Sequence, residues 1–370
     1  MMTQADKRIG ILISFSGQGG VERMVTNLAR GFLAQGFAVD MLLIKAKGEH
    51  LANIPRQVNV IKLKAQHNIT CLPEITAYLK HTPPQALLVA KHRAIRMAVI
   101  ARYLAGSRVR LVGRLGTTVS GALSGQSWLR KALWHWDMRF FYRWVDKLIA
   151  VSDGVRDDVL TITGLAPERV VVANNPVVVP EIMDKAQQPP PHQWLVNKEF
   201  PVIVAAGRFT RQKDFATLLD ALAIVNQTRS CRLIILGEGK LRADLESQVE
   251  RLGLQQQVAM PGFTDNPYAY MARSDLFVLS SRWEGSPNVL KEALSLGIPV
   301  VATDCPSGPR QILRDGKFGP LVAMGDAPAL AQAVVQVLDA PLPAQTLRQA
   351  VQDYTLEASS AAYLKILNMV

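Results

Sequence analysis

Residues 280–297 read SSRWEGSPNVLKEALSLG, and this stretch decides how the second half of the chain folds. The apolar run 276–279 before it is typical of a buried strand. After Ser286 and Pro287, apolar residues recur at helical spacing as far as Gly297. Serine suits a helix N-cap, proline the first helical position, and glycine the residue after the last turn. The pattern predicts a strand, a tight loop and a helix, with Ser286 as N-cap and Pro287 as the first helical residue.

Two glutamates, Glu284 and Glu292, lie eight positions apart in this unit. Glu284 falls in the predicted loop and Glu292 on the second turn of the predicted helix. Open parallel sheets bind ligands at the carboxyl ends of their strands, and a helix N-terminus favours phosphate. We therefore expect both carboxylates to face one ligand crevice. Because two glutamates at helical distance are also common on solvated faces, a solvent-exposed pair is the alternative.

The surrounding residues resemble glycosyltransferase family 4, the retaining transferases of the GT-B fold. The resemblance runs through EGSPNVLKEA and GIPVVATD within residues 281–304, and through GRFTRQK at residues 207–213. It implies an α/β protein with two Rossmann-like domains, each a doubly wound parallel sheet, and an interdomain cleft. The resemblance is strong over residues 201–322 and thin over residues 1–180.

The length and composition also favour two domains. A chain of 370 residues with 49% hydrophobic residues can form two cores of about 150 to 200 residues each. Strand and helix patterns alternate through both halves, which predicts doubly wound sheets. Residues 176–201, rich in proline and glutamine, predict a semi-rigid linker. We expect one domain over 1–180 and a second over 181–350. The final segment, 351–370, should cross back to the first domain. The apolar spacing of residues 347–367 predicts one continuous helix there.

The resemblance assigns the acceptor to the first domain and the nucleotide sugar to the second. Arg208 and Lys213 follow a strand end, where a guanidinium and an ammonium suit a diphosphate. Glu284 would lie by the sugar hydroxyls, nearest the chemistry, and Glu292 would accept hydrogen bonds from the ribose hydroxyls. Glu284, Arg208 and Lys213 are therefore the predicted catalytic residues. The other second-domain residues assigned to the donor are Gly207, Phe263, Thr264, Gly285, Ser286, Pro287, Asn288, Val289 and Leu290, with Phe263 and Thr264 as contacts of the nucleotide base.

The sequence contains no D-x-D metal-binding pattern, and we expect neither a metal nor a cofactor. The charge that develops on the departing diphosphate would then be met by Arg208, Lys213 and the helix N-terminus at Ser286. Front-face attack and a covalent intermediate are both open as routes to retention. A nucleotide-sugar epimerase of the same architecture and a non-catalytic binder of sugar nucleotides or polyanions are the alternative functions.

Residues 305–313, CPSGPRQIL, differ from the commoner family sequence because Gln311 replaces an acid. This segment resembles the branch that builds lipopolysaccharide, capsule and O-antigen repeats. The resemblance implies a hexose or N-acetylhexosamine from a UDP-sugar as donor, and a lipid-linked or lipopolysaccharide-type glycan as acceptor.

Two loops of the first half are further candidate sites. Residues 15–20 read FSGQGG between a predicted strand and a predicted helix, and glycines let the backbone approach a ligand closely. GGVE resembles the first loop of the family, which implies that Gly19 and Gly20 contact the donor phosphate or the acceptor; a simple tight turn is the alternative. In the predicted loop 113–118, where many family members carry a histidine, we expect Arg114 to contact a phosphate or the acceptor, or to be an ordinary surface arginine.

The net charge of +12 is confined to the first half, because residues 1–180 carry +13 and residues 181–370 carry −1. The excess favours an acidic partner, and without any nucleic-acid-binding motif we expect no nucleic acid. Residues 128–147 combine four tryptophans with basic side chains, which is typical of an anionic membrane surface. The same segment also fits an ordinary core face formed by Leu129, Leu133, Trp136 and Phe140.

The chain lacks the roughly 18 consecutive apolar residues that a spanning helix needs. Its start, MMTQADKRIG, leads into a strand without a signal-peptide pattern. We expect a cytoplasmic protein that attaches to the inner face of the cytoplasmic membrane. Cys71, Cys231 and Cys305 lack metal-ligand spacing and are predicted to be free, buried thiols.

Overall fold

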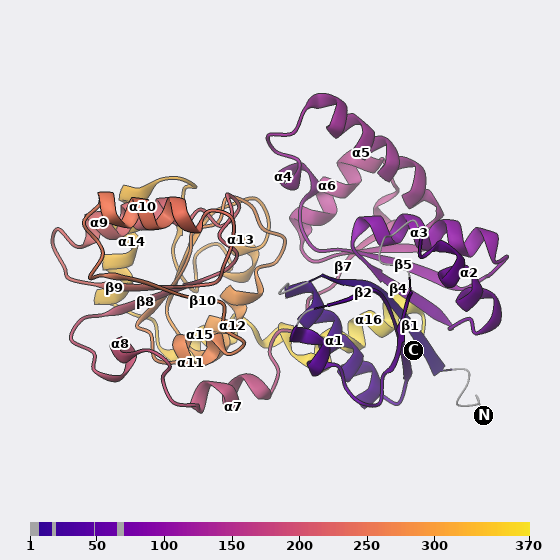
Figure 1. Cartoon of the computed structure of the whole chain (residues 1–370), viewed down its shortest axis with the longest axis horizontal. Helices are drawn as coiled ribbons and strands as arrows, with labels where there is room; N and C mark the ends of the chain where they lie inside the picture. The colour runs from indigo at the N-terminus through magenta and orange to yellow at the C-terminus, as the bar shows by residue number, and fades with distance from the viewer. Residues whose placement is uncertain (1–6, 17–19, 48, 65–69) are drawn as a thin grey trace. The chain divides into compact units, whose positions relative to one another are not determined.

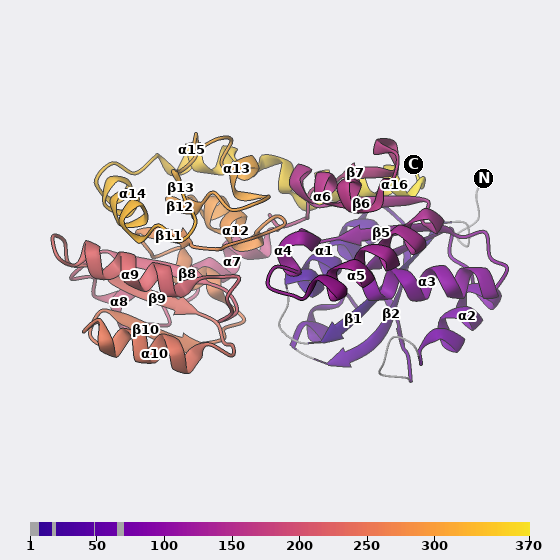
Figure 2. The same cartoon turned by 90° about the horizontal axis from the view of Figure 1, so that it is seen from above.

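A computed structural model of the chain describes residues 7–16, 20–47, 49–64 and 70–370. The chain forms two compact units (Figures 1 and 2). Unit 1 comprises Met1–Val177 with Tyr354–Val370, and unit 2 comprises Val178–Asp353. Each unit is a parallel sheet with helices on both faces. The predicted doubly wound α/β architecture is confirmed.

The described residues of unit 1 form a seven-stranded parallel sheet in the order β3-β2-β1-β4-β5-β6-β7. Because the strand order turns back between β1 and β4, that is the switch point where such sheets bind ligands. The middle of strand β1 is apolar because the sheet is covered on both faces: Ile11 and Leu12 point to opposite faces and both are buried. The strands are β1 (Arg8–Ser16), β2 (Ala38–Lys47), β3 (Asn59–Lys62), β4 (Ala86–Ala90), β5 (Arg110–Leu115), β6 (Lys147–Ala150) and β7 (Val170–Val172).

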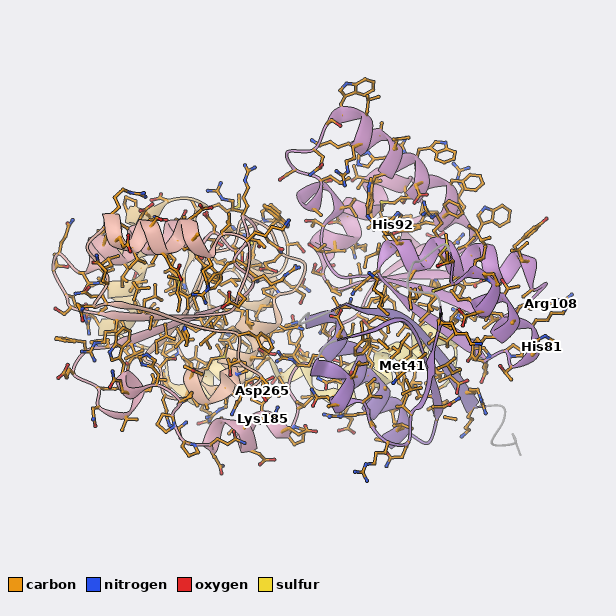
Figure 3. The ribbon with its side chains drawn as sticks, viewed as in Figure 1. Met41, His81, His92, Arg108, Lys185 and Asp265 are labelled. Carbon is orange, nitrogen blue, oxygen red and sulfur yellow. The ribbon has the colours of Figure 1, made fainter. Side chains whose placement is uncertain are left out.

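Two helical layers cover the sheet of unit 1. Helices α1 and α16 pack over one face, on a core that includes Met41, labelled in Figure 3. Helices α2, α3, α5 and α6 cover the other face, on a core around Ile95 and Tyr142. The helical segments are α1 (Gly20–Ala34), η2 (Glu49–Asn53), α2 (Leu72–His81), α3 (His92–Leu104), α4 (Val119–Ala122), α5 (Trp128–Phe141), η3 (Tyr142–Trp144), α6 (Asp153–Thr163), η4 (Pro167–Arg169) and α16 (Leu356–Leu367).

The last helix packs on the first one in unit 1. Gly31 allows this close approach, because a Cβ atom there would lie 2.5 Å from Cβ of Ser360. The prediction of one helix over residues 347–367 is wrong. Residues 350–355 separate α15 from α16, because the Thr355 hydroxyl accepts a hydrogen bond from the Ala358 amide and starts a new helix.

Unit 2, whose residues are all described, contains a six-stranded parallel sheet in the order β10-β9-β8-β11-β12-β13. This order repeats that of the first six strands of unit 1, and its switch point lies between β8 and β11. Its strands are β8 (Val202–Ala206), β9 (Arg232–Leu236), β10 (Val258–Gly262), β11 (Leu276–Leu279), β12 (Val300–Thr303) and β13 (Leu321–Val322).

Helices also cover both faces of the unit 2 sheet. Helices α9, α10 and α14 pack over one face, on a core that includes Leu218, Ile235 and Val334. On the other side α12 contacts α7, α11 and α15. The helical segments are α7 (Glu181–Gln187), α8 (Gln193–Val196), α9 (Phe215–Val225), α10 (Arg242–Arg251), α11 (Pro267–Met271), α12 (Asn288–Leu296), α13 (Pro309–Ile312), α14 (Ala327–Asp339), α15 (Ala344–Gln349) and η5 (Gln352–Tyr354).

The segment 176–201 is not the predicted linker, because from Val178 onward it folds onto unit 2. Helix α7 buries Ile182 and Ala186 and packs on α11. The Arg273 guanidinium donates a hydrogen bond to the carbonyl of Ala186 (2.8 Å). A proline-rich composition therefore concealed a short helix that is held by tertiary contacts.

Helix α5 does not use the predicted core face. All four residues of that face are exposed, and of the residues of α5 only Met138 is buried. Together with neighbouring residues they form an exposed apolar stripe, which runs to Trp144 in η3. The stripe comprises Trp128 (74% exposed), Leu129, Leu133 (67%), Trp136, Phe140 and Trp144. Within the described ranges, no helix is long and apolar enough to span a bilayer.

Candidate functional site

Two loops meet at the switch point of unit 2, the loop after β8 and the loop after β11. The Arg282 amide donates a hydrogen bond to the carbonyl of Gln212 (2.8 Å). The Ser280 hydroxyl donates to the carbonyl of Lys213, also at 2.8 Å. These cross-links fix the two loops together, so the side chains that they carry have defined relative positions.

The loops bring Lys213 and Glu284 into an ion pair, with 2.6 Å between Nζ and Oε1. The two side chains are 15% and 9% exposed. The Ser281 hydroxyl donates to the same carboxylate oxygen (2.8 Å). Gly207 leaves room for the lysine, because a Cβ atom there would lie 2.8 Å from Lys213 Cε. The pair is therefore held in place, and the solvated alternative for Glu284 is wrong.

Arg208, in the same loop, is exposed, and its guanidinium has no partner among the described residues. Its five N–H donors are thus available to a ligand at the carboxyl end of β8. Asp214, which ends the loop, adopts the left-handed conformation (φ 48°) and pairs with Arg282 at 2.9 Å. The loop therefore carries Arg208 without a side-chain partner among the described residues, while its other contacts hold the backbone in place.

Helix α12 begins one residue later than predicted. It starts at Asn288, so Pro287 occupies the N-cap position and Ser286 lies outside the helix. The Ser286 hydroxyl does not cap the helix because it accepts a hydrogen bond from the Lys291 ammonium (2.9 Å), and the Lys291 side chain is fully buried. Gly297 ends the helix in the left-handed conformation (φ 79°), as predicted.

The remaining predicted residues of unit 2 differ in access. Glu292 is buried on the second turn of α12, with the Tyr268 hydroxyl 3.5 Å from Oε1. Leu290 is fully buried, so its side chain belongs to the core. Residues that are partly exposed at the carboxyl end of β10 or in the first turn of α12 are Phe263, Thr264, Asn288 and Val289.

A third segment, residues 305–308, supports the Glu284 loop. The Glu284 amide donates to the carbonyl of Pro306 (3.3 Å), and the Ser307 hydroxyl donates to the carbonyl of Gly285 (2.9 Å). Gly308 has φ 92°, and a Cβ atom there would lie 2.9 Å from the Gly285 oxygen. Only glycine fits this position without displacing the loop.

Gly308→Ala should therefore weaken donor binding as well as stability. Gly316 offers a matched control because it has φ 91° but the nearest atom to an added Cβ is 3.8 Å away. Both alanine variants should lose about 1 to 3 kcal/mol of unfolding free energy through backbone strain. Only Gly308→Ala should also weaken binding of UDP in a calorimetric titration. Equal nucleotide binding by the two variants would contradict a positioning role for Gly308.

Cys305, the first residue of this segment, is buried and unreactive. Burial, and then the negative charge of Glu284, raise the pKa of its thiol to about 12. The thiol therefore stays protonated near neutral pH and is not a nucleophile. All three cysteines are free and buried, as predicted.

In unit 1 the structure corrects the prediction for Arg114. Arg114 belongs to strand β5 instead of a loop. It is not a surface arginine, because the residue is only 2% exposed. Its Nη2 donates to Oδ1 of Asn175 (2.7 Å). Gly20 is the exposed first residue of α1, whereas Gly19 lies outside the described residues.

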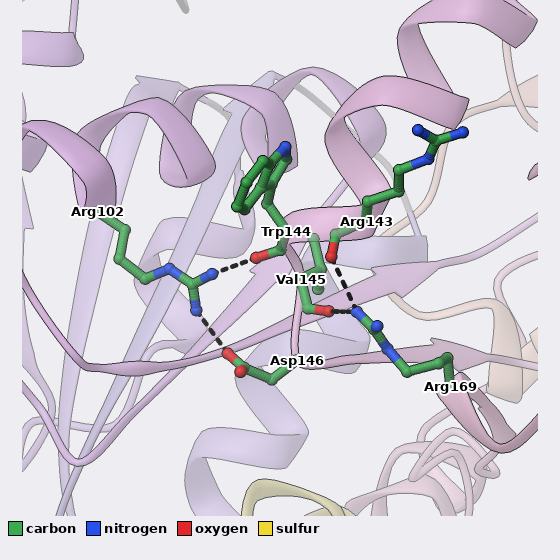
Figure 4. A pocket seen from close by; sticks show the side chains of 6 residues that line it. All are labelled: Arg102, Arg143, Trp144, Val145, Asp146 and Arg169. Carbon is green, nitrogen blue, oxygen red and sulfur yellow. Dashed lines mark hydrogen bonds and ion pairs between the residues drawn. The ribbon is translucent and has the colours of Figure 1, made fainter. Parts of the chain in front are cut away.

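The pocket in Figure 4 is separate from these sites and lies at the amino ends of β6 and β7 in unit 1. Arg102 donates hydrogen bonds to the Asp146 carboxylate (2.6 Å) and the Trp144 carbonyl. Arg169 donates to the carbonyls of Arg143 (3.2 Å) and Val145. Both guanidinium groups are thus engaged in fixing the chain that follows α5.

Several residues of the unit 2 site were not predicted from the sequence. Ser281 and Ser307 are ordinary loop serines, and no local signal marks them. Lys291 could have been noticed, because it stands next to Glu292 on a helix whose neighbouring positions are apolar. A lysine at this position of α12 is either buried itself or interrupts the apolar face of the helix.

Family comparisons match both units. The model for Glycosyltransferase Family 4 matches residues 18–179, and the model for Glycosyl transferases group 1 matches residues 200–340. Structure comparison gives a TM-score of 0.78 with HepE of Anabaena, solved in complex with UDP and glucose, at 22% identity over 98% of this chain and all of that one. At that identity the likeness establishes the fold.

Curated relatives have names from bacterial glycan synthesis. The Campylobacter jejuni N-acetylgalactosamine-N,N'-diacetylbacillosaminyl-diphospho-undecaprenol 4-alpha-N-acetylgalactosaminyltransferase is 29% identical over 90% of each chain. A lipopolysaccharide core biosynthesis glycosyltransferase of Rhizobium meliloti is 34% identical over 45% of this chain and 49% of its own. The Salmonella typhimurium lipopolysaccharide 1,6-galactosyltransferase is 28% identical over 54% of each.

Proposed function

Because the chain belongs to the family 4 glycosyltransferases of the GT-B fold, we propose that it moves a hexose or N-acetylhexosamine from a UDP-sugar to a lipid-linked or lipopolysaccharide-type glycan, with retention and without a metal. The observation that carries the proposal is the Lys213–Glu284 pair beside the free Arg208 at the switch point of unit 2. These groups supply both a cationic surface for a diphosphate and a carboxylate for sugar hydroxyls.

In the transfer, the bond between the anomeric carbon and the diphosphate oxygen breaks, and an acceptor oxygen forms the new glycosidic bond. Negative charge develops on the departing diphosphate. Lys213 and the N-terminus of α12 are held in place and stabilise this charge without reorganising, and the exposed Arg208 supplies a further charged donor. Glu284 orients the lysine and binds the sugar, and Glu292 binds the ribose. The acceptor proton leaves to the diphosphate oxygen or to solvent.

The acceptor class is inferred from the relatives and from the charge. One relative is named for a diphospho-undecaprenol substrate, and two are named for lipopolysaccharide synthesis. Residues 1–180 carry a net charge of +13, which suits a negatively charged lipid carrier and its membrane. We propose that unit 1 binds this acceptor.

A transfer assay tests the proposal. The protein is incubated with a panel of radiolabelled nucleotide sugars and a bacterial membrane lipid extract, and the label is followed into the organic phase. We expect label in a lipid product from one UDP-sugar. Conversion of the donor alone would indicate an epimerase, and binding without any turnover would indicate a non-catalytic protein; either result would refute the transferase.

We also propose that the exposed apolar stripe holds unit 1 on the cytoplasmic face of an anionic membrane. Trp136 and Phe140 stack within the stripe, with 5.6 Å between ring centroids. Arg130 and Arg143 are exposed beside it. Aromatic rings with flanking cations are the composition of helices that lie in the membrane interface. The arginine contacts in Figure 4 keep Trp144 at the end of the stripe.

Vesicle sedimentation should detect this attachment. The protein should pellet with anionic vesicles at low salt, but not with neutral ones, and binding should weaken at 0.1 M salt, where charges are screened over about 10 Å. Replacing Arg130, Lys131 and Arg143 by glutamine should weaken binding about 100-fold, at about 1 kcal/mol for each charge. Arg139 is left in place because it donates a structural hydrogen bond to the carbonyl of Ile162.

The matched control removes three other exposed charges of unit 1, through Arg56→Gln, Lys62→Gln and Lys80→Gln. If both triple variants lost binding equally, net charge alone would attract the vesicles. If neither lost binding, or if anionic and neutral vesicles bound equally, the membrane role of the stripe would be contradicted.

A further inference from the structure

Unit 1 has its own partly buried ion pair at the switch point of its sheet. Lys91 directly follows β4, and Glu22 lies in the first turn of α1, which comes after β1. Lys91 Nζ lies 2.9 Å from Oε1 of Glu22 and donates to the Ser14 carbonyl at 2.8 Å. The lysine side chain is 35% exposed and the glutamate 3%. The ammonium therefore reaches the surface while the carboxylate stays inside.

This pair occupies the same topological place as the pair in unit 2. Both sheets share the order of their first six strands, and β1 and β4 correspond to β8 and β11. In each unit a lysine and a glutamate link the segments after the two central strands. Parallel sheets bind their ligands at this position. The first unit thus has a binding position that is built like that of the second.

The backbone at Lys91 is strained. Its φ is 80° and its ψ is 135°, a conformation that glycine adopts readily and other residues adopt at a cost. Glycine would relieve the strain but would remove the ammonium. Non-glycine residues in such conformations cluster at ligand sites, where the side chain is needed.

The surroundings of the pair are positive. Arg114 is buried on β5, beside Lys91, whose amide donates to the Arg114 carbonyl (3.4 Å). Among the described residues no carboxylate lies within ion-pair distance of Arg114, and its Nε has no hydrogen-bond partner. The first turn of α3, all of it described, contains no acidic residue, so its dipole is not offset. The carboxylate of Glu22 thus has one lysine in contact, and a helix N-terminus and a strand with a buried arginine adjoin that lysine.

We propose that Lys91 binds a phosphate oxygen of the acceptor. Glu22 and the Ser14 carbonyl take two of the three ammonium donors and fix the lysine, and the third donor has no partner within the described structure. A compact, partly exposed ammonium in positive surroundings suits an anion better than a neutral sugar hydroxyl. The inference rests on the proposed function, which supplies an acceptor that carries phosphate.

Calorimetric titration with inorganic pyrophosphate tests this binding. The full chain carries Arg208→Ala, which weakens the competing site in unit 2. In that background Lys91→Gln should weaken pyrophosphate binding about 10- to 100-fold, the effect of one charge-assisted hydrogen bond. Lys62→Gln, which removes an exposed lysine from β3, should leave binding unchanged. Unchanged binding in Lys91→Gln would overturn the proposal.

Two further variants separate binding from folding. Lys91→Gly should lose pyrophosphate binding, but its Tm should fall less than that of Lys91→Gln, because both variants leave the Glu22 carboxylate without its counterion and only glycine relieves the backbone strain. Glu22→Gln keeps an acceptor for the ammonium but removes the opposing charge, so pyrophosphate should bind more tightly. Weaker binding in Glu22→Gln with unchanged Tm would overturn the anion assignment and favour a hydroxyl ligand.

Geranyl diphosphate and UDP complete the test. Tighter binding of geranyl diphosphate than of pyrophosphate would place the anion on a lipid carrier, and equal binding would place it on a phosphate without lipid; both outcomes support an anion site. Binding of UDP, measured with Arg208 intact, should be unaffected by Lys91→Gln. Failure of the transfer assay in the unaltered protein would refute the proposed function without changing these titrations, so the two failures are distinguishable.

Discussion

Lys213→Met should lower kcat/KM for sugar transfer by about 100- to 1,000-fold, the cost of removing one preorganised donor from a developing oxyanion. The ammonium is held 2.6 Å from Glu284, so it needs no reorganisation to meet the departing diphosphate. Removing it also leaves the Glu284 carboxylate buried without its counterion, which lowers stability. Transfer is measured with the labelled UDP-sugar, and stability by urea unfolding.

A double variant separates the two effects. Lys213→Met with Glu284→Gln removes both charges, so the unfolding free energy should recover towards that of the unaltered protein while transfer stays low. Lys317→Met, an exposed lysine of unit 2, is the control for charge alone. Recovery of transfer in the double variant would contradict the catalytic role of Lys213 and leave the pair a structural one.

Glu284→Ala and Glu292→Ala should fail in different ways. Glu284→Ala should lower kcat by about 100-fold or more while UDP still binds, because its carboxylate holds the lysine and, in the proposed function, binds the sugar. Glu292→Ala should weaken UDP binding about 10- to 100-fold through lost ribose hydrogen bonds, with a smaller effect on kcat. Steady-state kinetics and a UDP titration measure the two effects. Normal binding and turnover in both variants would refute the assignment of the motif to the donor.

Local signals explain why the unit around β11 and α12 could be predicted. The apolar run 276–279 and the helical spacing that ends at Gly297 each depend on residues close in sequence, and β11 and the end of α12 match them. The start of the helix was misplaced by one residue, and Ser286 instead has a side-chain partner on the helix itself. Its hydroxyl binds the buried ammonium of Lys291, which competes with capping.

Helix α5 shows what periodicity cannot decide. Leu129, Leu133 and Trp136 recur at helical spacing, which fits a core face and a membrane-facing stripe equally. The structure places Met138 inward and exposes the predicted core face. Only the packing of α5 on α3 and α6 settles which side is covered.

The Lys91–Glu22 pair was missed for a different reason. Its residues are 69 positions apart, and although Glu22 ends the GGVE sequence, no local signal links it to Lys91. The rule that drew attention to Arg208, a basic residue at a strand's carboxyl end, applies equally to Lys91 after β4. The register of β4 beside β1 then brings the lysine to the glutamate. Arg114, by contrast, looked like a loop residue because β5 extends three residues beyond the predicted strand end.

The rate of labelled-sugar transfer in excess EDTA tests the central claim most directly. The proposed site meets the charge of the diphosphate with Arg208, Lys213 and the N-terminus of α12 instead of a divalent ion. The initial rate should therefore be the same in EDTA as in added magnesium or manganese. A rate that fell in EDTA to the level of Lys213→Met, and returned when the metal was restored, would contradict the account.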